Sequence, residues 1–233
     1  MHIGSQITEA GPFAAAIEKV APLVRDLKSK YKIEFFSIGG GMGIVYRRAL
    51  ESGSGEWWHN HGGETSAFSV RDYANAIVPP LRELNVRVLI EPGRFLVGNG
   101  GALLTRVLYI KKSGAKTFAI VDAGMNDLIR PALYQSYHEI VPIAVGSGDS
   151  PNRHKIDIVG PVCESGDFFA LDREMPELRE GDLLAIMSAG AYGFVMASNY
   201  NSRPLPAEAL VRGDRVSLIR KRQTWEDLVR DEI

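Results

Sequence analysis

Residues 33–43 read IEFFSIGGGMG, a short apolar run that stops at a cluster of glycines. A run of this length bounded by glycine predicts a buried β-strand over residues 33–38. Glycines directly after a strand let several backbone N–H groups converge on an anion, because no Cβ obstructs them. The cluster therefore favours a phosphate site, and a tight turn is the alternative.

A second segment of the same kind lies at residues 86–94, which read VRVLIEPGR. Its apolar half predicts a second buried strand, and Glu91-Pro92-Gly93-Arg94 stands where the glycines stand after the first. Arg94 can offer a charge-assisted pair of hydrogen bonds to the same phosphate. Phosphate sites on neighbouring strands of a barrel are a recurring arrangement, so two such loops together favour an anion site over two unrelated turns.

Helical patterns surround these strands. Residues 13–28 place apolar side chains on one helix face, with Pro12 positioned to start the helix. Residues 69–84 predict another helix, with Ser69 as N-cap, Asp72 three residues on, and a kink at Pro79-Pro80. The predicted buried face of this helix consists of Val70, Tyr73, Ile77, Leu81 and Leu84. Alternating strands and helices indicate βα units of a parallel sheet or barrel, with residues 2–6 as a possible third strand.

Past residue 95 the pattern changes to short strands separated by Gly, Asp and Pro. We expect strands at residues 103–110, 117–121, 156–162, 183–187 and 216–219, a hairpin turn at 111–116, and a short amphipathic closing helix at 224–233. The predicted fold class is α/β plus all-β, with residues 1–95 forming the last strands of a (β/α)8 barrel and residues 96–233 an antiparallel β-sandwich or barrel domain. A closed barrel needs roughly 250 residues, so the chain carries the end of one without its beginning.

The composition excludes several classes of function. The 233 residues carry 27 Lys and Arg against 28 Asp and Glu, a formal net charge of −1. Such a chain has no basic field to hold nucleic acid or an anionic membrane. No apolar run approaches the roughly 18 residues of a membrane span, and residues 1–11 do not resemble a secretory signal. The single cysteine, Cys163, has no internal disulfide partner, so we expect a reducing, cytoplasmic setting.

Three motifs of the second part carry candidate chemistry. Cys163 lies in GPVCESGD (160–167), either as a small core residue or in an exposed loop where its thiol can donate a proton. The run IRPALY (129–134) offers Arg130 and Tyr134 as a clamp for a carboxylate. In GAYG (190–193), Tyr192 can lie against a flat ligand, or belong to the core or a turn.

The long irregular stretch at residues 47–68 is the candidate lid or binding segment. It contains Trp57-Trp58 and the pair His59 and His61, which would share one face of a strand and could then hold a metal. No third ligand lies nearby, so a polar loop is favoured and no metal site is predicted.

Six motifs in order resemble the pyridoxal-phosphate-dependent diaminopimelate decarboxylases, which share a barrel fold with ornithine decarboxylase and alanine racemase. The motifs are HIGSQ (2–6), GGGMG (39–43), EPGR (91–94), IRPALY (129–134), CESGD (163–167) and GAYG (190–193). The resemblance is closer to the diaminopimelate branch than to the ornithine branch because of CESGD and IRPALY.

The resemblance implies how pyridoxal 5'-phosphate would bind. His2 would stack on the pyridine ring, and Ser5 with the Gly40-Gly41 turn would bind the phosphate. Glu91 would pair with the protonated ring nitrogen and keep the ring an electron sink. Arg94, preceded by Pro92 and Gly93, would contact the phosphate and a substrate carboxylate, while Tyr192 would line both cofactor and substrate.

The resemblance also implies the substrate, meso-diaminopimelate, which would be converted to L-lysine and CO2. Arg130 and Tyr134 would hold the carboxylate at the far end of the substrate, and Glu164 its distal amino group. Cys163 would return a proton to the carbanion after CO2 leaves. In this family the CESGD segment crosses a two-fold interface, so the resemblance implies a homodimer whose active sites are completed by the partner subunit.

The family holds its cofactor as a Schiff base to a lysine on an early barrel strand. The nine lysines of this chain are predicted to fall on helix faces, turns or loops, so we interpret it as the C-terminal half of a decarboxylase, inactive alone. The alternatives are a decarboxylase of another basic amino acid, and a non-catalytic pyridoxal-phosphate-binding or regulatory partner of a full-length paralogue. The set of Cys163, Glu164, Arg130 and Tyr134 argues against the second, since a pure binding protein needs no proton donor.

Overall fold

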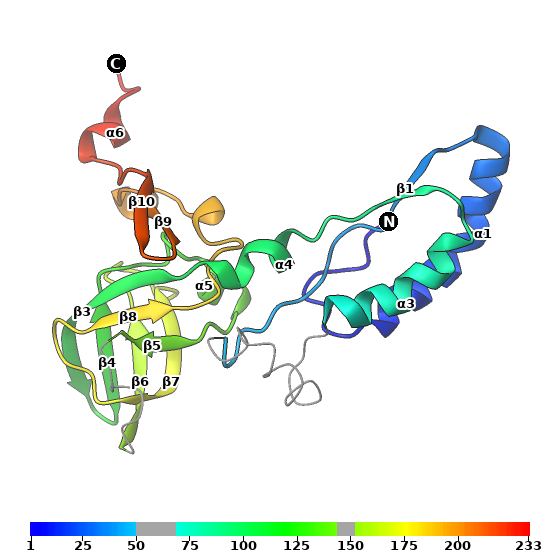
Figure 1. Ribbon diagram of the computed structural model, residues 1–233. Helices are drawn as coiled ribbons and strands as arrows, with labels where there is room; N and C mark the ends of the chain where they lie inside the picture. The colour runs from blue at the N-terminus through cyan, green and yellow to red at the C-terminus, as the bar shows by residue number, and fades with distance from the viewer. Residues whose placement is uncertain (50–68, 144–151) are drawn as a thin grey trace. The chain divides into compact units, whose positions relative to one another are not determined.

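The computed structural model describes residues 1–49, 69–143 and 152–233 (Figure 1). The chain divides into two compact units, Met1–Gly100 and Gly101–Ile233. The first is an α/β unit and the second is built mainly of strands, so the predicted fold class is confirmed. Among the described residues, no helix has the length and apolar character that crossing a bilayer requires.

Two packed helices form the core of the first unit. Helix α1 (Gly11–Tyr31) has Pro12 in its first turn, as predicted, and runs three residues further than expected. Helix α3 (Val70–Arg82) starts at Ser69, whose side chain and that of Asp72 form the predicted capping box. The rings of Phe13 and Tyr73 meet edge to face, 5.0 Å apart between centroids. The helices bury one face each, formed by Phe13, Ile17, Ala21 and Val24 of α1 and by Tyr73, Ile77 and Leu81 of α3.

Val70 is a correction to the predicted buried face. Its side chain is exposed, because it is the first residue of α3 and lies outside the core cluster, whereas Leu84 beyond the helix end is buried as predicted. The helix continues through Pro79 and Pro80 to Arg82.

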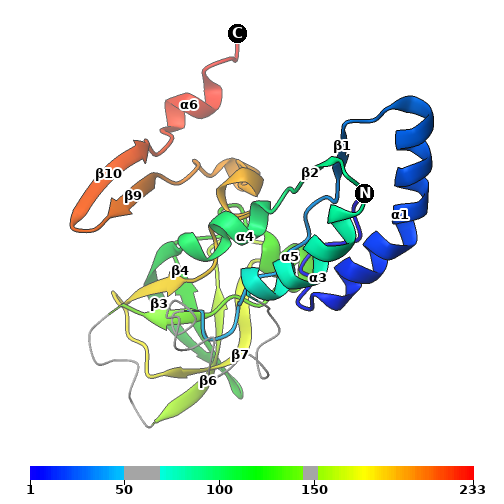
Figure 2. The ribbon, with the colours of Figure 1, turned by 45° about the vertical axis from the view of Figure 1, so that its right-hand side comes forward.

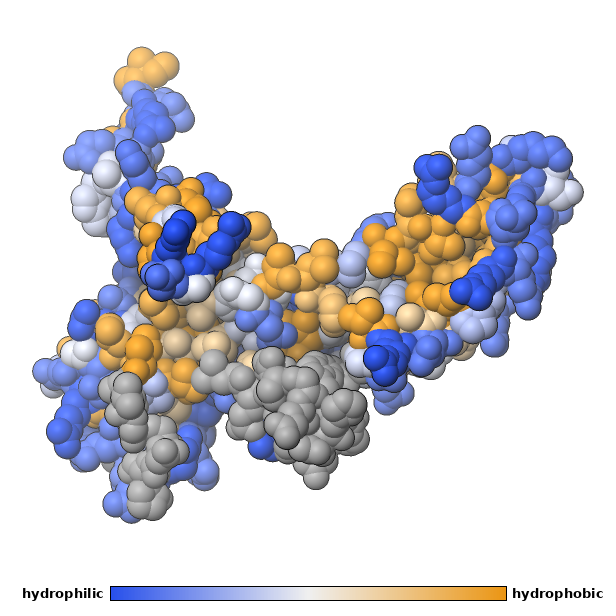
Figure 3. Space-filling model, in the orientation of Figure 1, coloured by the Kyte–Doolittle hydropathy of each residue, from blue (hydrophilic) through white to orange (hydrophobic). Residues whose placement is uncertain are grey.

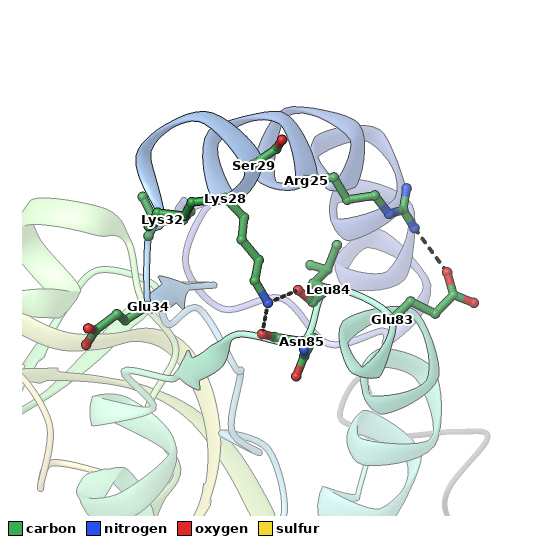
Figure 4. Close-up of a pocket in the computed structure, with 9 residues that line it drawn as sticks. Arg25, Lys28, Ser29, Lys32, Glu34, Glu83, Leu84 and Asn85 are labelled. Carbon is green, nitrogen blue, oxygen red and sulfur yellow. Dashed lines mark hydrogen bonds and ion pairs between the residues drawn. The ribbon is translucent and has the colours of Figure 1, made fainter.

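Polar contacts tie the last turn of α1 to the chain that leaves α3 (Figure 4). Lys28 donates from Nζ to the carbonyl oxygens of Leu84 and Asn85, and Arg25 forms a 3.0 Å ion pair with Glu83. These residues line an open pocket at the helix ends. Two of its cationic side chains, Lys28 and Arg25, bind backbone carbonyls and a glutamate. They therefore hold the ends of the two helices together, and we assign the pocket no ligand.

Strands β1 (Phe35–Ser37) and β2 (Arg87–Leu89) pair in parallel, as βα units require. Both are shorter than predicted, and neither is buried: Phe35 is 59% exposed, and Leu89 is exposed as well. Phe36 and Val88 pack against the helix core, whereas Phe35 and Leu89 alternate with them along the strands and so face the other side of this two-stranded sheet. Residues 2–6 do not form the possible third strand, and only Ile7 bridges in parallel to Met42.

The second unit contains a six-stranded sheet with strand order β5-β8-β3-β4-β6-β7. Figure 1 labels all six strands, and Figure 2 shows β3, β4, β6 and β7 from another side. Its strands are β3 (Leu103–Ser113), β4 (Lys116–Val121), β5 (Ile140–Pro142), β6 (Arg153–Val159), β7 (Phe168–Pro176) and β8 (Leu183–Ile186). Neighbours are antiparallel except β4 and β6, which are parallel, so the predicted antiparallel sheet is in fact mixed. The chain passes through α5 (Arg130–Tyr134) and β5 between them, and this long crossover permits the parallel return.

Several boundaries differ from the predicted ones. The β3–β4 turn is two residues, with Gly114 at φ 59°, rather than the whole of residues 111–116. Four lysines that were expected in turns or loops therefore lie in strands. They are Lys111 and Lys112 of β3, Lys116 of β4 and Lys155 of β6. Strands β5, β7 and β9 (Glu208–Arg212) were not predicted. Strand β5 has only three residues, and β7 carries charges in its middle.

The C-terminal segment is a separate hairpin of β9 (Glu208–Arg212) and β10 (Arg215–Arg220), followed by α6 (Trp225–Val229). Apolar side chains of the hairpin are exposed, and the hairpin is partly orange in Figure 3. Val211, Val216 and Leu218 share one face of the hairpin, and Leu210 lies on the other. Helix α6 is shorter than the predicted helix over 224–233 and buries no residue, so it does not close the core as expected.

Candidate functional site

The predicted phosphate turn of the first unit is a place where three backbone segments meet. A Cβ on Gly40 would lie 2.2 Å from the carbonyl oxygen of Glu91, and one on Gly41 would lie 2.3 Å from that of Gly4. Gly41 also has a φ of 105°, which disfavours any side chain. Only glycine permits this approach, so the turn, the segment before Ile7 and the loop after β2 are held together by their main chains.

Hydrogen bonds fix the same three segments. The N–H of Ile7 donates to Gly41 O at 2.9 Å, and that of Glu91 donates to Gly39 O at 2.9 Å. His2 is adjacent to this turn, since a Cβ on Gly39 would lie 3.2 Å from its Nδ1. Ser5 follows Gly4 and is exposed. The structure therefore groups His2, Ser5, Gly40, Gly41 and Glu91 around one turn.

Glu91 has a partner that the sequence analysis missed. The hydroxyl of Ser37, the last residue of β1, donates to Glu91 Oε1 at 2.6 Å, and the N–H of Gly39 donates to Ser37 Oγ at 3.1 Å. The glycine turn, Ser37 and Glu91 thus form one chain of hydrogen bonds that orients the carboxylate. The signal was present, because a serine at the end of an apolar strand stands at the same sheet edge as the loop after the next strand.

Arg94 also has a missed partner. It lies in the short helix α4 (Gly93–Val97), where its guanidinium donates to the hydroxyl of Tyr46 and lies 5.9 Å over that ring. Pro92 is the N-cap residue of α4. A Cβ on Gly93 would meet nothing within 4 Å, so the geometry does not require glycine there as it does at Gly40.

Cys163 lies in an exposed loop of the second unit, as the proton-donor interpretation requires, and not in the core. The loop is anchored by Asp167, which is buried and accepts 2.6 Å hydrogen bonds from the N–H groups of Met125 and Val162. A Cβ on Gly160 would lie 2.3 Å from both carboxylate oxygens of Asp167. Burial raises the pKa of Asp167, against the opposing effect of these two donors. The Cys163 loop is thereby tied to the loop that leads into α5.

Glu164 accepts a hydrogen bond from Tyr200, another missed residue, at 3.1 Å from the phenol oxygen to Oε2. Tyr200 starts the short 3-10 helix η5 (Tyr200–Ser202). This segment is held by Arg203, which donates to Asn126 Oδ1 at 2.8 Å and to the carbonyl of Asp122 at 2.6 Å. The Glu164 carboxylate raises the pKa of Tyr200 for two reasons. It accepts a hydrogen bond from the neutral phenol, and its negative charge disfavours the phenolate.

The Glu164–Tyr200 bond gives a pH prediction. In Glu164→Gln the charge is removed, so we expect the pKa of Tyr200 to fall toward the ordinary tyrosine value of 10.0. The measurement is a titration of tyrosinate absorbance in both proteins, with Tyr200→Phe identifying the component that belongs to Tyr200. Indistinguishable titration curves for the wild type and Glu164→Gln would contradict the bond.

Arg130 and Tyr134 stand at the two ends of α5 in different surroundings. Arg130 is 5% exposed, and its Nη1 lies 3.0 Å from His138 Nε2 while Nη2 donates to Ser136 Oγ at 3.2 Å. Tyr134 is 60% exposed. His138, to which no sequence motif gives a role, is fully buried and has Nδ1 2.8 Å from Met187 O.

Tyr192 belongs to an exposed turn and not to the core. Its φ is 59°, and a Cβ on the following Gly193 would lie 2.2 Å from Ala189 O. The N–H of Ala189 donates to the carbonyl of Gly101 at 2.8 Å. A tight backbone thus presents the tyrosine ring at the surface of the second unit.

The predicted cofactor ligands other than Tyr192 lie in Met1–Gly100, and the predicted substrate ligands other than Arg94 lie in Gly101–Ile233. His59, His61 and most of the candidate lid at 47–68 fall outside the described residues. In the described ranges, no cluster of three or more His, Cys, Asp or Glu side chains is arranged to hold a metal ion. The lysines of the first unit, Lys19, Lys28, Lys30 and Lys32, lie on α1 and its C-cap.

Comparisons with known proteins show the family to which the chain belongs. The family model described as "Pyridoxal-dependent decarboxylase, C-terminal sheet domain" matches residues 23–190. Diaminopimelate decarboxylase of Aquifex aeolicus is 44% identical over 231 residues, which is 98% of this chain and 50% of the relative. That of Zymomonas mobilis is 46% identical over 232 residues, or 99% of this chain and 51% of the relative.

A solved structure shows the same arrangement. The crystal structure of diaminopimelate decarboxylase from Helicobacter pylori complexed with L-lysine matches with a TM-score of 0.82 and 42% identity, over 98% of this chain and 52% of that one. The chain spans about half the length of the curated relatives it matches.

The first unit joins a glycine turn to an oriented glutamate, and the second unit carries an exposed cysteine–glutamate loop and a mixed β-sheet, so the chain is of the α/β-plus-β class. The chain belongs to the pyridoxal-dependent decarboxylase family, whose C-terminal sheet domain it contains.

Proposed function

We propose that this chain is the C-terminal half of an enzyme that decarboxylates meso-diaminopimelate to L-lysine and CO2. The observation that carries the proposal is the exposed Cys163–Glu164 loop, fixed by Asp167 and found in a chain 42–46% identical to diaminopimelate decarboxylases. A substrate with two amino and two carboxylate groups needs both cationic and anionic ligands, and this chain supplies both in Arg94, Arg130 and Glu164.

The residues of the first unit fit pyridoxal phosphate. The turn at Gly40 and Gly41 packs against the main chain of Glu91 and Gly4, and Ser5, exposed next to Gly4, would offer its hydroxyl to the phosphate. Glu91, oriented by Ser37, supplies the carboxylate for a protonated ring nitrogen. When bound, the cofactor supplies an electron sink for the electron pair that remains after CO2 departs.

The residues of the second unit would bind and reprotonate the substrate. Arg130 and Tyr134 would hold the carboxylate farthest from the reacting carbon, and Glu164 would accept a hydrogen bond from the distal ammonium. The Cys163 thiol would donate its proton to the carbon that loses CO2. Tyr200 would keep one oxygen of Glu164 in place, and Tyr192 would present its ring to the substrate.

The proposal includes a homodimer, in which the Cys163–Glu164 loop completes the site of the partner subunit. Exposure of Cys163 and Glu164 at the surface of the second unit supports a role outside their own unit. A reducing, cytoplasmic setting is part of the proposal, because the exposed thiol must stay reduced to donate a proton.

The first test is the mass of the protein isolated from its own cells after borohydride reduction, together with decarboxylation of meso-diaminopimelate. We expect a mass well above 25.6 kDa, one reduced pyridoxyl group on a lysine that precedes residue 1, and release of L-lysine and CO2. A 25.6 kDa protein without the pyridoxyl group and without activity would contradict the proposal and favour a regulatory partner. Faster turnover of ornithine, arginine or lysine would favour a decarboxylase of another basic amino acid.

A further inference from the structure

We infer that His138 is a positioning residue, which holds the Arg130 guanidinium as a neutral hydrogen-bond acceptor and couples it to the segment that carries Tyr192. His138 is fully buried between α5 and the end of β8. It takes no part in the roles assigned above.

The hydrogen-bond partners of His138 fix its protonation state. The carbonyl of Met187 can only accept, so Nδ1 at 2.8 Å must carry a proton and donate it. Arginine can only donate, so Nε2 at 3.0 Å from Arg130 Nη1 must be unprotonated and accept. The two bonds together require the neutral Nδ1–H tautomer of His138.

Neutrality of the acceptor matters for Arg130. His138 and Ser136 orient the guanidinium through Nη1 and Nη2, and neither carries a charge in these bonds. A carboxylate in the place of His138 would hold the same guanidinium but would cancel its charge. The imidazole of His138 therefore positions the buried Arg130 guanidinium without adding a negative charge of its own.

His138 also links two ligand-binding motifs within the second unit. Its own segment is fixed to the end of β8, because the N–H of Met187 donates to the carbonyl of Glu139 at 2.8 Å. Met187 lies five residues before Tyr192. The turn at Tyr192 is tightly packed, since a Cβ on Gly193 would lie 2.2 Å from Ala189 O. A displaced His138 ring would thus shift Arg130 and the start of the Tyr192 segment together.

Two variants with amide side chains each keep one of the two hydrogen bonds of His138 and lose the other. In His138→Gln, the side-chain oxygen reaches the position of Nε2 and can still accept from Arg130, whereas in His138→Asn the shorter amide reaches only the position of Nδ1 and keeps the Met187 bond. The consequence for catalysis rests on the proposed function, in which Arg130 binds a substrate carboxylate. In the full-length gene product we expect His138→Asn to raise KM for meso-diaminopimelate about tenfold with little change in kcat, and His138→Gln to restore most of this loss.

Equal effects of both variants on KM, or no effect of either, in an enzyme whose wild type is active would overturn the inference. His154→Asn and His154→Gln, at an exposed site on β6, are the matched controls for the substitution itself. Thermal unfolding of all four variants separates a loss of folded protein from a change in KM.

A spectroscopic measurement on the chain itself keeps failure of the inference distinct from failure of the proposed function. Two-bond proton–nitrogen correlation spectra distinguish the histidine tautomers, and the signal missing in His138→Gln assigns His138. We expect the Nδ1–H tautomer whether or not the protein decarboxylates diaminopimelate. An Nε2–H tautomer or an imidazolium at neutral pH would rule out the acceptor role.

Discussion

Replacement of Gly40 by alanine is expected to abolish binding of pyridoxal phosphate and to lower the unfolding free energy by about 3 kcal/mol or more. The new Cβ would lie 2.2 Å from the carbonyl oxygen of Glu91 and 3.2 Å from its carbonyl carbon. Both atoms are main chain, so a side-chain rotation cannot relieve the overlap. The loop after β2 would have to move away from the turn, and Glu91 would move with it.

The measurements are urea unfolding and the increase in cofactor absorbance or fluorescence on titration with pyridoxal phosphate. Gly11→Ala is the control in the same unit, because a Cβ there meets nothing within 4 Å and the residue starts a helix. It should leave both quantities nearly unchanged. A Gly40→Ala protein that unfolds and binds the cofactor like the wild type would mean that the close contact with Glu91 is not a feature of the native turn.

This turn shows why part of the site was open to prediction from sequence. Gly39-Gly40-Gly41 and Glu91 follow two apolar strands, and parallel strands bring their C-terminal ends to one edge, so the pattern alone placed them together. The burial of those strands was predicted wrongly. An apolar run indicates that other elements could pack on the strand, but it does not show whether such elements are present. Phe35 and Leu89 are exposed for that reason.

The partners of the predicted residues could not be found in the same way. His138 reaches Arg130 across a loop, Tyr200 reaches Glu164 from 36 residues away, and Tyr46 reaches Arg94 from 48 residues away. All three contacts are made by residues in loops or short helices, whose paths follow no periodic pattern, so a single sequence carries no signal for them. The parallel β4–β6 pair escaped prediction because a short strand does not show the direction of its neighbour.

Replacement of Asp167 by alanine is expected to lower the unfolding free energy by about 3 kcal/mol, since two part-buried N–H donors lose a buried charged acceptor. Met125 and Val162 donate to its two oxygens at 2.6 Å each. Without the carboxylate, the segment that holds Cys163 and Glu164 loses its tie to the loop before α5. In the full-length enzyme we expect decarboxylation to fall at least about 100-fold, because small displacements of reacting groups have effects of that size.

The variant Asp167→Asn should lose only part of this stability. Its amide oxygen can accept one of the two hydrogen bonds, while its NH2 group faces the other donor and cannot accept. Its loss of stability should therefore lie between those of the wild type and Asp167→Ala in urea unfolding. Asp172→Asn is the control, at an exposed position with φ 47° that asparagine tolerates well. If Asp167→Ala kept wild-type stability and activity, the anchoring of the Cys163 loop through Asp167 would be wrong, and the loop would have to be held by its own backbone turns.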